Sequence, residues 1–571
     1  MLSVVLPKNL RTGDLEGIAR ASFHYATHYL NSKGESMRWP AGREWLEGGV
    51  DELADAIEYL SLSERQLARG TEVLETIVRH TAGRLAEQAG EAALDRIAST
   101  LQQKSGEQTE RMAAAIFVSA FVFHTAIERQ GDIPSVPLEG SIDKGQLLSR
   151  WNATCDINYL PIFTVACDLL KELPIIAVPP VMNRIAQSIS ELVQLGVTTY
   201  HDLAGRMFQT LITDRKFLAT SCTLPESAYL LAELAVERLD VDWSDRLAIE
   251  KLRIADFACG TGALLSAAQR AIYHRYRRGG GDDKDLHRHL MEQVLTGLDV
   301  MPAATHLTCS MPSSSHPSLS YGECQIHTVP YGIDGGETHI GALDLLDSDR
   351  SFSLFATNQT MGGTKSARRR QHSVTIKDKS CDLVIMNPPL PRPTNHEARY
   401  ADIPVPSFAG FQTAPEAQHA MQSKLKRAGS LFSDGHAGLA SNFMDLADRK
   451  LREGGVLAVV IPFVFLRGKS WKRAREALED RYSDIHVTSI ATTGSKARAL
   501  SADTKMAECL VVATRRSEAG SRAVFSNLAA RPSTLLEAAV GAKGANHKTV
   551  RGSILRFRDT VTVQEWILEA Q

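Results

Sequence analysis

The sequence predicts an α/β protein in which a doubly wound sheet follows an N-terminal all-helical domain. From about residue 51 to 203, apolar residues recur at every third and fourth position, which is the period of amphipathic helices. From about residue 252, short apolar runs alternate with helical stretches, as in a sheet that is covered on both faces. We expect a helical domain at 1–200, an α/β domain at 201–515 and a C-terminal extension at 516–571.

Seven β-rich runs, most of them continuously apolar, are the expected strands of the α/β domain. They are residues 252–259, 294–300, 324–332, 381–387, 455–462, 485–493 and 508–515. Stretches with a helical period, such as GALLSAAQRAIYHRYR and LASNFMDLADRKLREG, lie between them. This alternation predicts βαβ units, whose parallel strands place their carboxyl ends along one edge of the sheet.

Composition limits the class of protein but does not indicate a function. Lys and Arg total 64 against 66 Asp and Glu, so any contact with nucleic acid has to come from local basic patches. The eight cysteines form no C-x-x-C pair, which argues against a zinc site and against a disulfide framework. With no signal peptide and no long apolar run, the sequence predicts a cytoplasmic protein without membrane contact.

The first candidate ligand site is the glycine-rich segment Asp256–Gly262, which ends one predicted strand and opens a helix. Gly260 and Gly262, with the small residue Ala258, let the backbone approach a ligand, and bare N–H groups are expected to face it. Turns of this kind also bind dinucleotides or phosphates, and some only pack. The turn alone therefore leaves the ligand open.

Two carboxylates later in the sequence narrow the range of ligands that the glycine-rich turn could bind. Asp299 closes the next strand, where α/β nucleotide sites place an acid that accepts from ribose hydroxyls. Asp344 follows the third strand, where a carboxylate is placed to accept from an adenine amino group, although a helix N-cap would look the same. Position 265 is Leu, so the GxGxxG phosphate fingerprint is absent. This combination predicts a nucleoside-containing ligand without a pyrophosphate.

The candidate catalytic group is the tetrapeptide Asn387-Pro388-Pro389-Leu390, at the carboxyl end of the fourth predicted strand. Proline carries no N–H, so this turn offers only acceptors, which are the Asn387 amide oxygen and the Pro388 carbonyl. Two acceptors suit an –NH2 group, whose nitrogen becomes more nucleophilic when both hydrogens are held. A plain turn at the end of a strand is the alternative.

With these motifs the chain resembles the N6-adenine DNA methyltransferases in which the cofactor motif precedes N-P-P-[YF]. The resemblance covers about residues 205–515 and implies the S-adenosylmethionine (SAM)-dependent methyltransferase fold, a Rossmann-like mixed seven-stranded sheet that SADTKMAECLVVATR closes. It implies that Asp256–Gly262 binds the methionine part of SAM, that Asp299 holds the ribose and that Asp344 reads the adenine. Thr223 matches the family's threonine that helps to close over the carboxyl end of the cofactor.

Two features qualify the resemblance. The family usually has an aromatic residue where Leu390 stands, and that ring stacks on an adenine flipped out of the double-stranded DNA. Leucine covers a base less well, and Phe408 or Phe411 could supply the stack instead. The helical third, with WNATCDINYLPIF, is more loosely similar to the modification subunits of type I restriction systems. The expected role is therefore modification in a restriction or phage-defence system.

Basic residues after the catalytic turn are the expected contacts to DNA phosphates, although each cluster could equally be a solvated helix face. They are Arg392, Arg399, Lys424, Lys426, Arg427, Arg467, Lys469, Lys472, Arg473 and Arg475, together with the run at 365–370. The extension 516–571 is short for an independent recognition domain, so it could only begin a recognition or partner-docking region. We therefore expect either a specificity or defence-system partner subunit, or a continuation missing from this chain, to read the DNA sequence.

Two other functions stay open at the level of sequence. A protein glutamine N-methyltransferase also uses an N-P-P turn, but the large helical domain and the basic clusters argue against it. A non-catalytic module could keep the fold in order to bind DNA or a partner, and Leu390 is compatible with that function.

Overall fold

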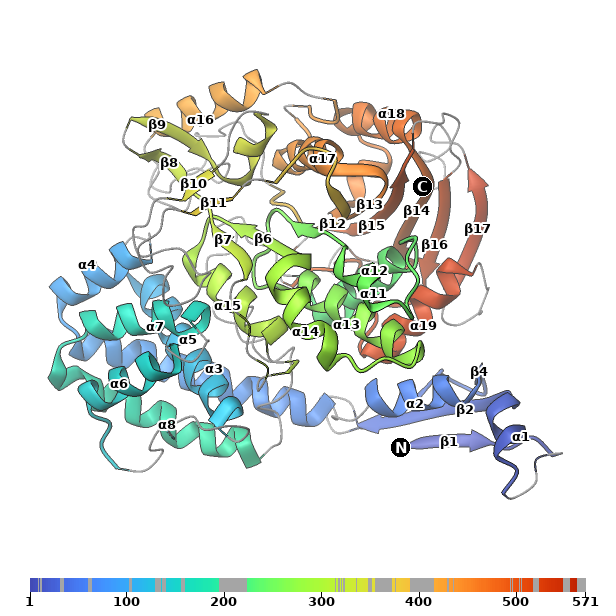
Figure 1. Cartoon of the computed structure of the whole chain (residues 1–571), viewed down its shortest axis with the longest axis horizontal. Coiled ribbons are helices and arrows are strands. Elements are labelled where there is room, and N and C mark those ends of the chain that lie inside the picture. Colours follow the sequence, from blue (N-terminus) through green and yellow to red (C-terminus); the bar gives the residue numbers. More distant parts are fainter. Residues whose placement is uncertain are drawn as a thin grey trace.

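The computed structural model has a mixed sheet at its centre (Figure 1). It describes residues 1–561 with larger gaps at 195–222, 355–371, 391–414 and 548–554 and gaps of six residues or fewer elsewhere. Within the described residues, the sheet has nine strands in the order β17-β16-β14-β15-β13-β12-β5-β6-β7. They are β5 (Ile254–Asp256), β6 (Leu295–Asp299), β7 (Gln325–Thr328), β12 (Cys381–Met386), β13 (Leu451–Pro462), β14 (Tyr482–Ile490), β15 (Glu508–Arg515), β16 (Ala523–Leu528) and β17 (Leu555–Val561).

All seven predicted strands are present, and the α/β fold class is confirmed. Strands β7, β6, β5, β12 and β13 are mutually parallel, and β15 runs antiparallel to both β13 and β14. The sheet is therefore mixed, as the resemblance implied. Two further strands come from residues after 515, because β16 pairs with β14 in parallel and β17 pairs with β16 antiparallel.

Successive residues of the central strands point to opposite faces of the sheet, as the two-residue strand period requires. In β12, Leu383 and Ile385 join one cluster of buried residues, whereas Val384 and Met386 join another. The first cluster includes α11 (Pro225–Val236), α13 (Ala263–Arg278), α15 (Pro302–Ser313) and α19 (Leu535–Asn546). The second includes α17 (Leu439–Lys450) and α18 (Lys472–Arg481). Burial on both faces explains why these strands read as continuous apolar runs.

Shorter elements connect the strands or lie above the sheet edge. They are α12 (Arg246–Glu250), α14 (Lys284–His289), the π-helix η3 (Leu290–Val294), β8 (Tyr331–Asp334), β9 (Glu337–Ile340), the 3-10 helices η4 (Gly341–Leu346), η7 (Phe463–Leu466) and η8 (Lys469–Trp471), β10 (Phe352–Leu354), β11 (His372–Val374) and α16 (Pro415–Arg427). Helix α16 packs on the hairpin of β8 and β9.

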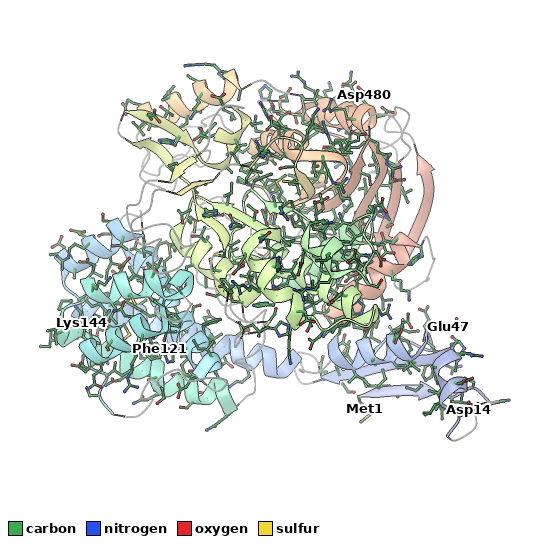
Figure 2. All side chains as sticks on the ribbon, viewed as in Figure 1. Met1, Asp14, Glu47, Phe121, Lys144 and Asp480 are labelled. Atoms are coloured by element: carbon green, nitrogen blue, oxygen red, sulfur yellow. The ribbon has the colours of Figure 1, made fainter. Side chains whose placement is uncertain are left out.

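The helical part lies beside the sheet domain (Figure 1). Its elements are α3 (Glu64–Gln88), α4 (Glu91–Thr100), α5 (Glu107–Glu128), α6 (Lys144–Thr154), α7 (Leu160–Glu172), the 3-10 helix η2 (Ile175–Ala177) and α8 (Val178–Gln194). Helix α2 (Val50–Tyr59) lies apart from them (Figure 1) and packs on α19. Figure 2 shows Phe121 among the helices of the helical part and Lys144 at their outer edge. Phe121 packs edge-to-face on Trp151 with ring centroids 5.5 Å apart. Helices α5 and α7 pack on α15, so one buried cluster joins the helices to the sheet.

The expectation that residues 1–200 are all helical is wrong for the first fifty residues. This segment contains β1 (Leu2–Val5), α1 (Leu15–Arg20), β2 (Phe23–Leu30), β3 (Ser36–Trp39) and β4 (Leu46–Gly48). The strands form a four-stranded antiparallel sheet in which β2 pairs with the other three. Strand β2 buries Phe23, Tyr25 and Thr27 on one side, and this two-residue alternation favours a strand over a helix. No helix in the described ranges is long and apolar enough to cross a membrane.

The residues after 515 complete the sheet, so their removal should destabilise it. Without them, β14 becomes an edge strand and α11 loses the cover of α19. We predict that a protein ending at Arg515 has a melting temperature lower by roughly 10 °C or more and scatters light on heating. A protein ending at Val561, which keeps both strands, is the control. Equal melting temperatures for the two truncated proteins would contradict the prediction.

Candidate functional site

The two predicted motifs lie side by side at the point where the strand order reverses. From β5 the chain proceeds through β6 and β7 on one side and through β12 and β13 on the other. Ala255 of β5 pairs with Val384 of β12, so Asp256 and Asn387 both follow at the carboxyl ends of adjacent strands. Adjacent strands lie about 4.8 Å apart, and open α/β sheets bind their ligands at such a reversal.

The glycine-rich turn pairs part of its backbone within the protein, so the expectation of bare N–H groups does not hold for four of its residues. Four of its N–H groups donate within the protein, because an unpaired N–H is costly where water is excluded. The bonds run from Ala258 to Asp256 Oδ1 (3.0 Å), from Cys259 to the carbonyl of Leu298 (3.0 Å), from Gly260 to Asp299 Oδ2 (2.9 Å) and from Gly262 to the carbonyl of Cys259 (2.8 Å). These four N–H groups already have hydrogen-bond partners and are not available to a phosphate.

The two glycines of the turn serve different purposes. Gly262 is the N-cap of α13 with a φ of 81°, and a Cβ there would come within 2.8 Å of the Thr308 Cα. Gly260 has a φ of 53°, and a Cβ there would meet only the Ala258 carbonyl, at 4.0 Å. Packing of α13 against α15 therefore requires Gly262, whereas the space beside Gly260 is open to a ligand.

The charges around the turn favour a cationic ligand. Asp256 is 1% exposed, and burial raises its pKa well above the usual range, to which the nearby charge of Asp299 adds. Burial also raises the pKa of Asp299. The hydrogen bonds that its carboxyl group accepts from the N–H groups of Met301 and Gly260 lower this pKa and so oppose the effect of burial. A positive charge beside these two carboxyl groups would stabilise their ionised form, which burial disfavours.

Asp344 lies in η4, near the same edge of the sheet, and is already paired. It is 2% exposed and forms an ion pair with Lys424 of α16, whose Nζ also donates to the Thr338 carbonyl at 2.6 Å. The His339 Nδ1 lies 3.5 Å from Asp344 Oδ2. The neighbouring Gly341 packs against Val300, the residue after Asp299, so η4 adjoins the end of β6. Asp344 thus ties α16 to the pocket.

Asn387 is held by two hydroxyl groups from distant parts of the chain. Its Nδ2 donates to Thr223 Oγ1 and to Ser501 Oγ, both at 2.9 Å. Thr223 and Ser501 also form a β-bridge, and Leu224 N donates to the Leu500 carbonyl at 3.2 Å. The sequence predicted Thr223 as a cofactor residue but gave no role to Ser501. Its only signal was its place in the SADTK segment before β15.

The rest of the tetrapeptide continues outward from Asn387. Asn387 and Pro388 are buried, and Pro389 and Leu390 are half-buried. Leu390 packs against the same buried cluster that covers the α17 face of the sheet. The predicted stacking alternatives Phe408 and Phe411 lie outside the described residues.

A group of exposed basic residues, the basic rim, follows the carboxyl end of β13, the strand next to β12. We use this name for Arg467, Lys469, Lys472 and Arg473, whose side chains are exposed. Arg475 is different, because it is buried and its Nη1 donates to the carbonyls of Phe465 and Gly468. It therefore braces the segment that carries the rim, and it is not a phosphate contact as predicted.

The other predicted basic residues are divided between helix α16 and undescribed segments. Lys426 and Arg427 of α16 are exposed, whereas Lys424 is engaged with Asp344. Arg392, Arg399 and the run at 365–370 lie outside the described residues.

No family model and no curated protein matches the chain. Among solved structures, a complex of DrdV with DNA aligns over 93% of this chain and 50% of its own, with a TM-score of 0.52 and 13% identity. The ATP-dependent Type ISP restriction-modification enzyme LlaBIII bound to DNA aligns over 87% and 32%, with a TM-score of 0.46 and 13% identity. A modification subunit of a putative type I restriction enzyme from Vibrio vulnificus aligns over 86% and 92%, with a TM-score of 0.45 and 13% identity.

The chain thus spans between a third and a half of the first structures that it matches. At these identities the likeness concerns the fold alone.

The packing of Gly262 leads to a test of the turn. We predict that Gly262→Ala lowers the free energy of unfolding by about 2–4 kcal/mol, because alanine is strained at this φ and its Cβ meets backbone. Gly280→Ala is the matched control, since its φ is 87° but nothing lies within 4 Å of the added Cβ. It should lose only about 1–2 kcal/mol. Equal losses in urea unfolding would show that packing against α15 is not the reason for the glycine.

Proposed function

We propose that this protein transfers a methyl group from SAM to N6 of an adenine flipped out of double-stranded DNA. Its role would be modification in a restriction-modification or phage-defence system. The observation that carries the proposal is the Asn387 amide, fixed at the carboxyl end of β12 beside an acid-lined glycine turn. The methyltransferase fold supports this proposal without specifying the substrate.

The residues of the turn fit the proposed cofactor. SAM supplies, when bound, an electrophilic methyl group on a positively charged sulfur. Asp256 and Asp299 favour a cation, and a carboxylate such as Asp299 can accept ribose hydroxyls in addition to its two N–H donors. The open space beside Gly260 allows close approach to the backbone. Asp344 can accept an adenine amino group beside Lys424, and Thr223 adjoins the same pocket.

The geometry of the turn after β12 suits an amino group as the target. The Nδ2 of Asn387 is engaged by two hydroxyls, so its oxygen is the end that can accept from a substrate. The carbonyl of Pro388 is the second acceptor, and neither proline offers a competing N–H. An amino nitrogen that gives both hydrogens to these acceptors loses conjugation with its ring and becomes a better nucleophile.

The surroundings favour DNA over a protein glutamine as the substrate. A glutamine amide offers the same two hydrogens, but the exposed cations of the basic rim complement a row of phosphates. DrdV, whose fold is similar, was solved with DNA. The described residues after 515 form strands β16 and β17 and helix α19, which belong to the sheet domain. We propose that a specificity or defence-system partner subunit reads the DNA sequence.

Incubation with methyl-labelled SAM tests the proposed function. Purified protein is supplied with duplex DNA or with a protein lysate, each with and without co-expressed neighbouring gene products. Label recovered as N6-methyladenine is the expected result. Label on glutamine would favour the protein methyltransferase, and binding of DNA or a partner without transfer would favour a non-catalytic module.

The role of Asn387 predicts a separation of chemistry from cofactor binding. Asn387→Ala should lose most methyl transfer, by about 100-fold or more, because the target amino group loses an acceptor. Its affinity for SAM in calorimetry should stay within about threefold of the wild type. In contrast, Asp299→Ala should weaken SAM binding itself, by roughly 1.5–3 kcal/mol. Undiminished transfer by Asn387→Ala would refute the mechanism.

Leu390 gives a prediction about capture of the flipped base. If weak stacking limits this step, Leu390→Phe should raise transfer, or binding to DNA with a mismatched adenine, several-fold, which corresponds to about 1 kcal/mol. A mismatched base costs less to extrude, so the gain is easiest to measure there. Leu390→Ala is the control and should reduce both quantities. No gain in Leu390→Phe, with SAM binding intact, would show that Leu390 is not limiting.

A further inference from the structure

The loop between β14 and β15 lies at the same edge of the sheet as Asn387. Strand β14 is parallel to β13, because both pair antiparallel with β15, and β13 is parallel to β12. The carboxyl ends of β12 and β14 therefore share one edge of the sheet, where the described residues of 491–507 lie. This loop holds Asn387 through Ser501, whose Oγ lies 2.9 Å from the amide nitrogen.

Arg498 of this loop has a defined position over an aromatic ring. Its guanidinium carbon Cζ lies 4.0 Å from the ring centroid of Phe463, which is close enough for a cation–π contact. Phe463 is buried and follows the last residue of β13, and its N–H donates to the Ala507 carbonyl at 2.8 Å. The carbonyl of Arg498 accepts from the Glu508 N–H at 3.1 Å. The backbone and the ring thus hold the guanidinium in place before any ligand binds.

The described residues give this guanidinium no hydrogen-bond acceptor. Its Nε is buried and unpaired, and the hydrogen bonds and ion pairs among the described residues do not include the Arg498 side chain. Other buried arginines of the sheet domain are paired, as Arg475 is with two carbonyls and Arg515 is with Asp448. A buried N–H normally has a partner in a folded protein. Arg498 is therefore oriented for an acceptor that a bound molecule can supply.

The position of Arg498 relative to Asn387 indicates the kind of acceptor. Arg498 comes three residues before Ser501, so the Cα atoms of these two residues lie within about 11 Å of each other. In the proposed reaction, Asn387 holds the amino group of an adenine that is rotated out of the duplex about its backbone. The phosphate of that nucleotide offers two oxygens, which match the planar donor fork of an arginine. A phosphate of the flipped nucleotide thus fits both the place and the donor geometry.

Phe463 also connects Arg498 to the basic rim. It is the first residue of η7, which ends at Leu466, directly before Arg467 of the rim. The rim side chains are exposed and suit the phosphates of an intact duplex, whereas Arg498 is only half-exposed. A nucleotide that leaves the duplex and enters the site can bring its phosphate to this less exposed position.

We propose that Arg498, supported by Phe463, binds the phosphate next to the adenine that the protein flips out of DNA. This inference rests on the proposed function, since it takes DNA to be the substrate. It adds a contact that forms with the extruded nucleotide and not with the intact duplex. Arg498 therefore favours DNA whose adenine is flipped, whereas the basic rim binds DNA of either kind.

Arg498→Met is the main test, because methionine can still cover Phe463 but carries no charge and no donor. Binding is measured without SAM, to a short duplex with one mismatched adenine and to the same duplex fully paired. The affinity for the mismatched duplex should fall about 10- to 30-fold, and that for the paired duplex by less than about threefold. The dependence of log affinity on log salt should weaken by about 0.9 for the mismatched duplex. An unchanged affinity for this duplex would overturn the inference.

Lys469→Met is the matched control, since it removes a cation from the exposed basic rim. It should weaken the binding of both duplexes by the same factor, because the rim meets phosphates of the intact helix. If Lys469→Met instead showed the same loss confined to the mismatched duplex, the effect would not be specific to position 498, against the inference.

A neutral phosphate analogue locates the contact. The mismatched duplex is prepared with a methylphosphonate on the 5′ side or on the 3′ side of the mismatched adenine. At one of these positions the wild type should lose about tenfold in affinity, and Arg498→Met should lose no more than about twofold further. Losses that multiply at both positions would show that Arg498 does not meet either phosphate and would overturn the inference.

A second variant covers the case in which Arg498→Met is unstable. Arg498→Lys keeps the positive charge as a single point in place of the planar fork. It should melt within about 2 °C of the wild type and still bind the mismatched duplex about threefold or more weakly. Wild-type affinity in Arg498→Lys would contradict binding through the fork.

Binding measured without SAM separates this inference from the proposed function. Methyl transfer to DNA by the wild type, with equal binding by Arg498→Met, would overturn the inference alone. Selective binding of the mismatched duplex that depends on Arg498, without transfer by the wild type, would refute the proposed transfer alone. If the wild type bound neither duplex, both would be refuted.

Discussion

The pairing of β5 with β12 is the constraint on which the rest of the site depends. Sequentially they are separated by β6, β7 and the segments after them, yet in the sheet they are neighbours. This reversal of strand order brings a glycine turn with two carboxyl groups next to a turn that offers only acceptors. Each of these turns alone is common and weakly informative. The proposed transfer from SAM to an amino group depends on their adjacency.

The charge balance of the glycine turn separates this site from the phosphate sites that similar turns form. In a phosphate site, free N–H groups at a helix N-terminus bind the anion. Here Asp256 and Asp299 accept from the N–H groups of Ala258 and Gly260. These two N–H groups are therefore not available to an anion, and the carboxyl groups that accept from them disfavour one. Leu265 in the position of the third fingerprint glycine agrees with this difference.

The sequence predicted the strands well because both faces of the sheet are buried. It predicted the residues at strand ends, such as Asn387 and Asp256, because strand periodicity and Gly or Pro turns mark them locally. It missed Ser501, whose role arises from a contact with Asn387, more than a hundred positions away. The prediction for Arg475 failed for a related reason, because a helical charge pattern does not show which charges a neighbouring loop needs as donors. The N-terminal sheet was missed because three of its four strands have only three or four residues.

The residues after 515 contribute to the site, although the sequence suggested a separate extension. Arg531 follows β16 and donates to the Ala499 carbonyl, two residues before the serine that holds Asn387. Strand β16 also covers the edge of β14, which would otherwise be open. The residues after 515 therefore help to hold the segment that carries Ser501, and through it the Asn387 amide, so they belong to the same folded unit as the site.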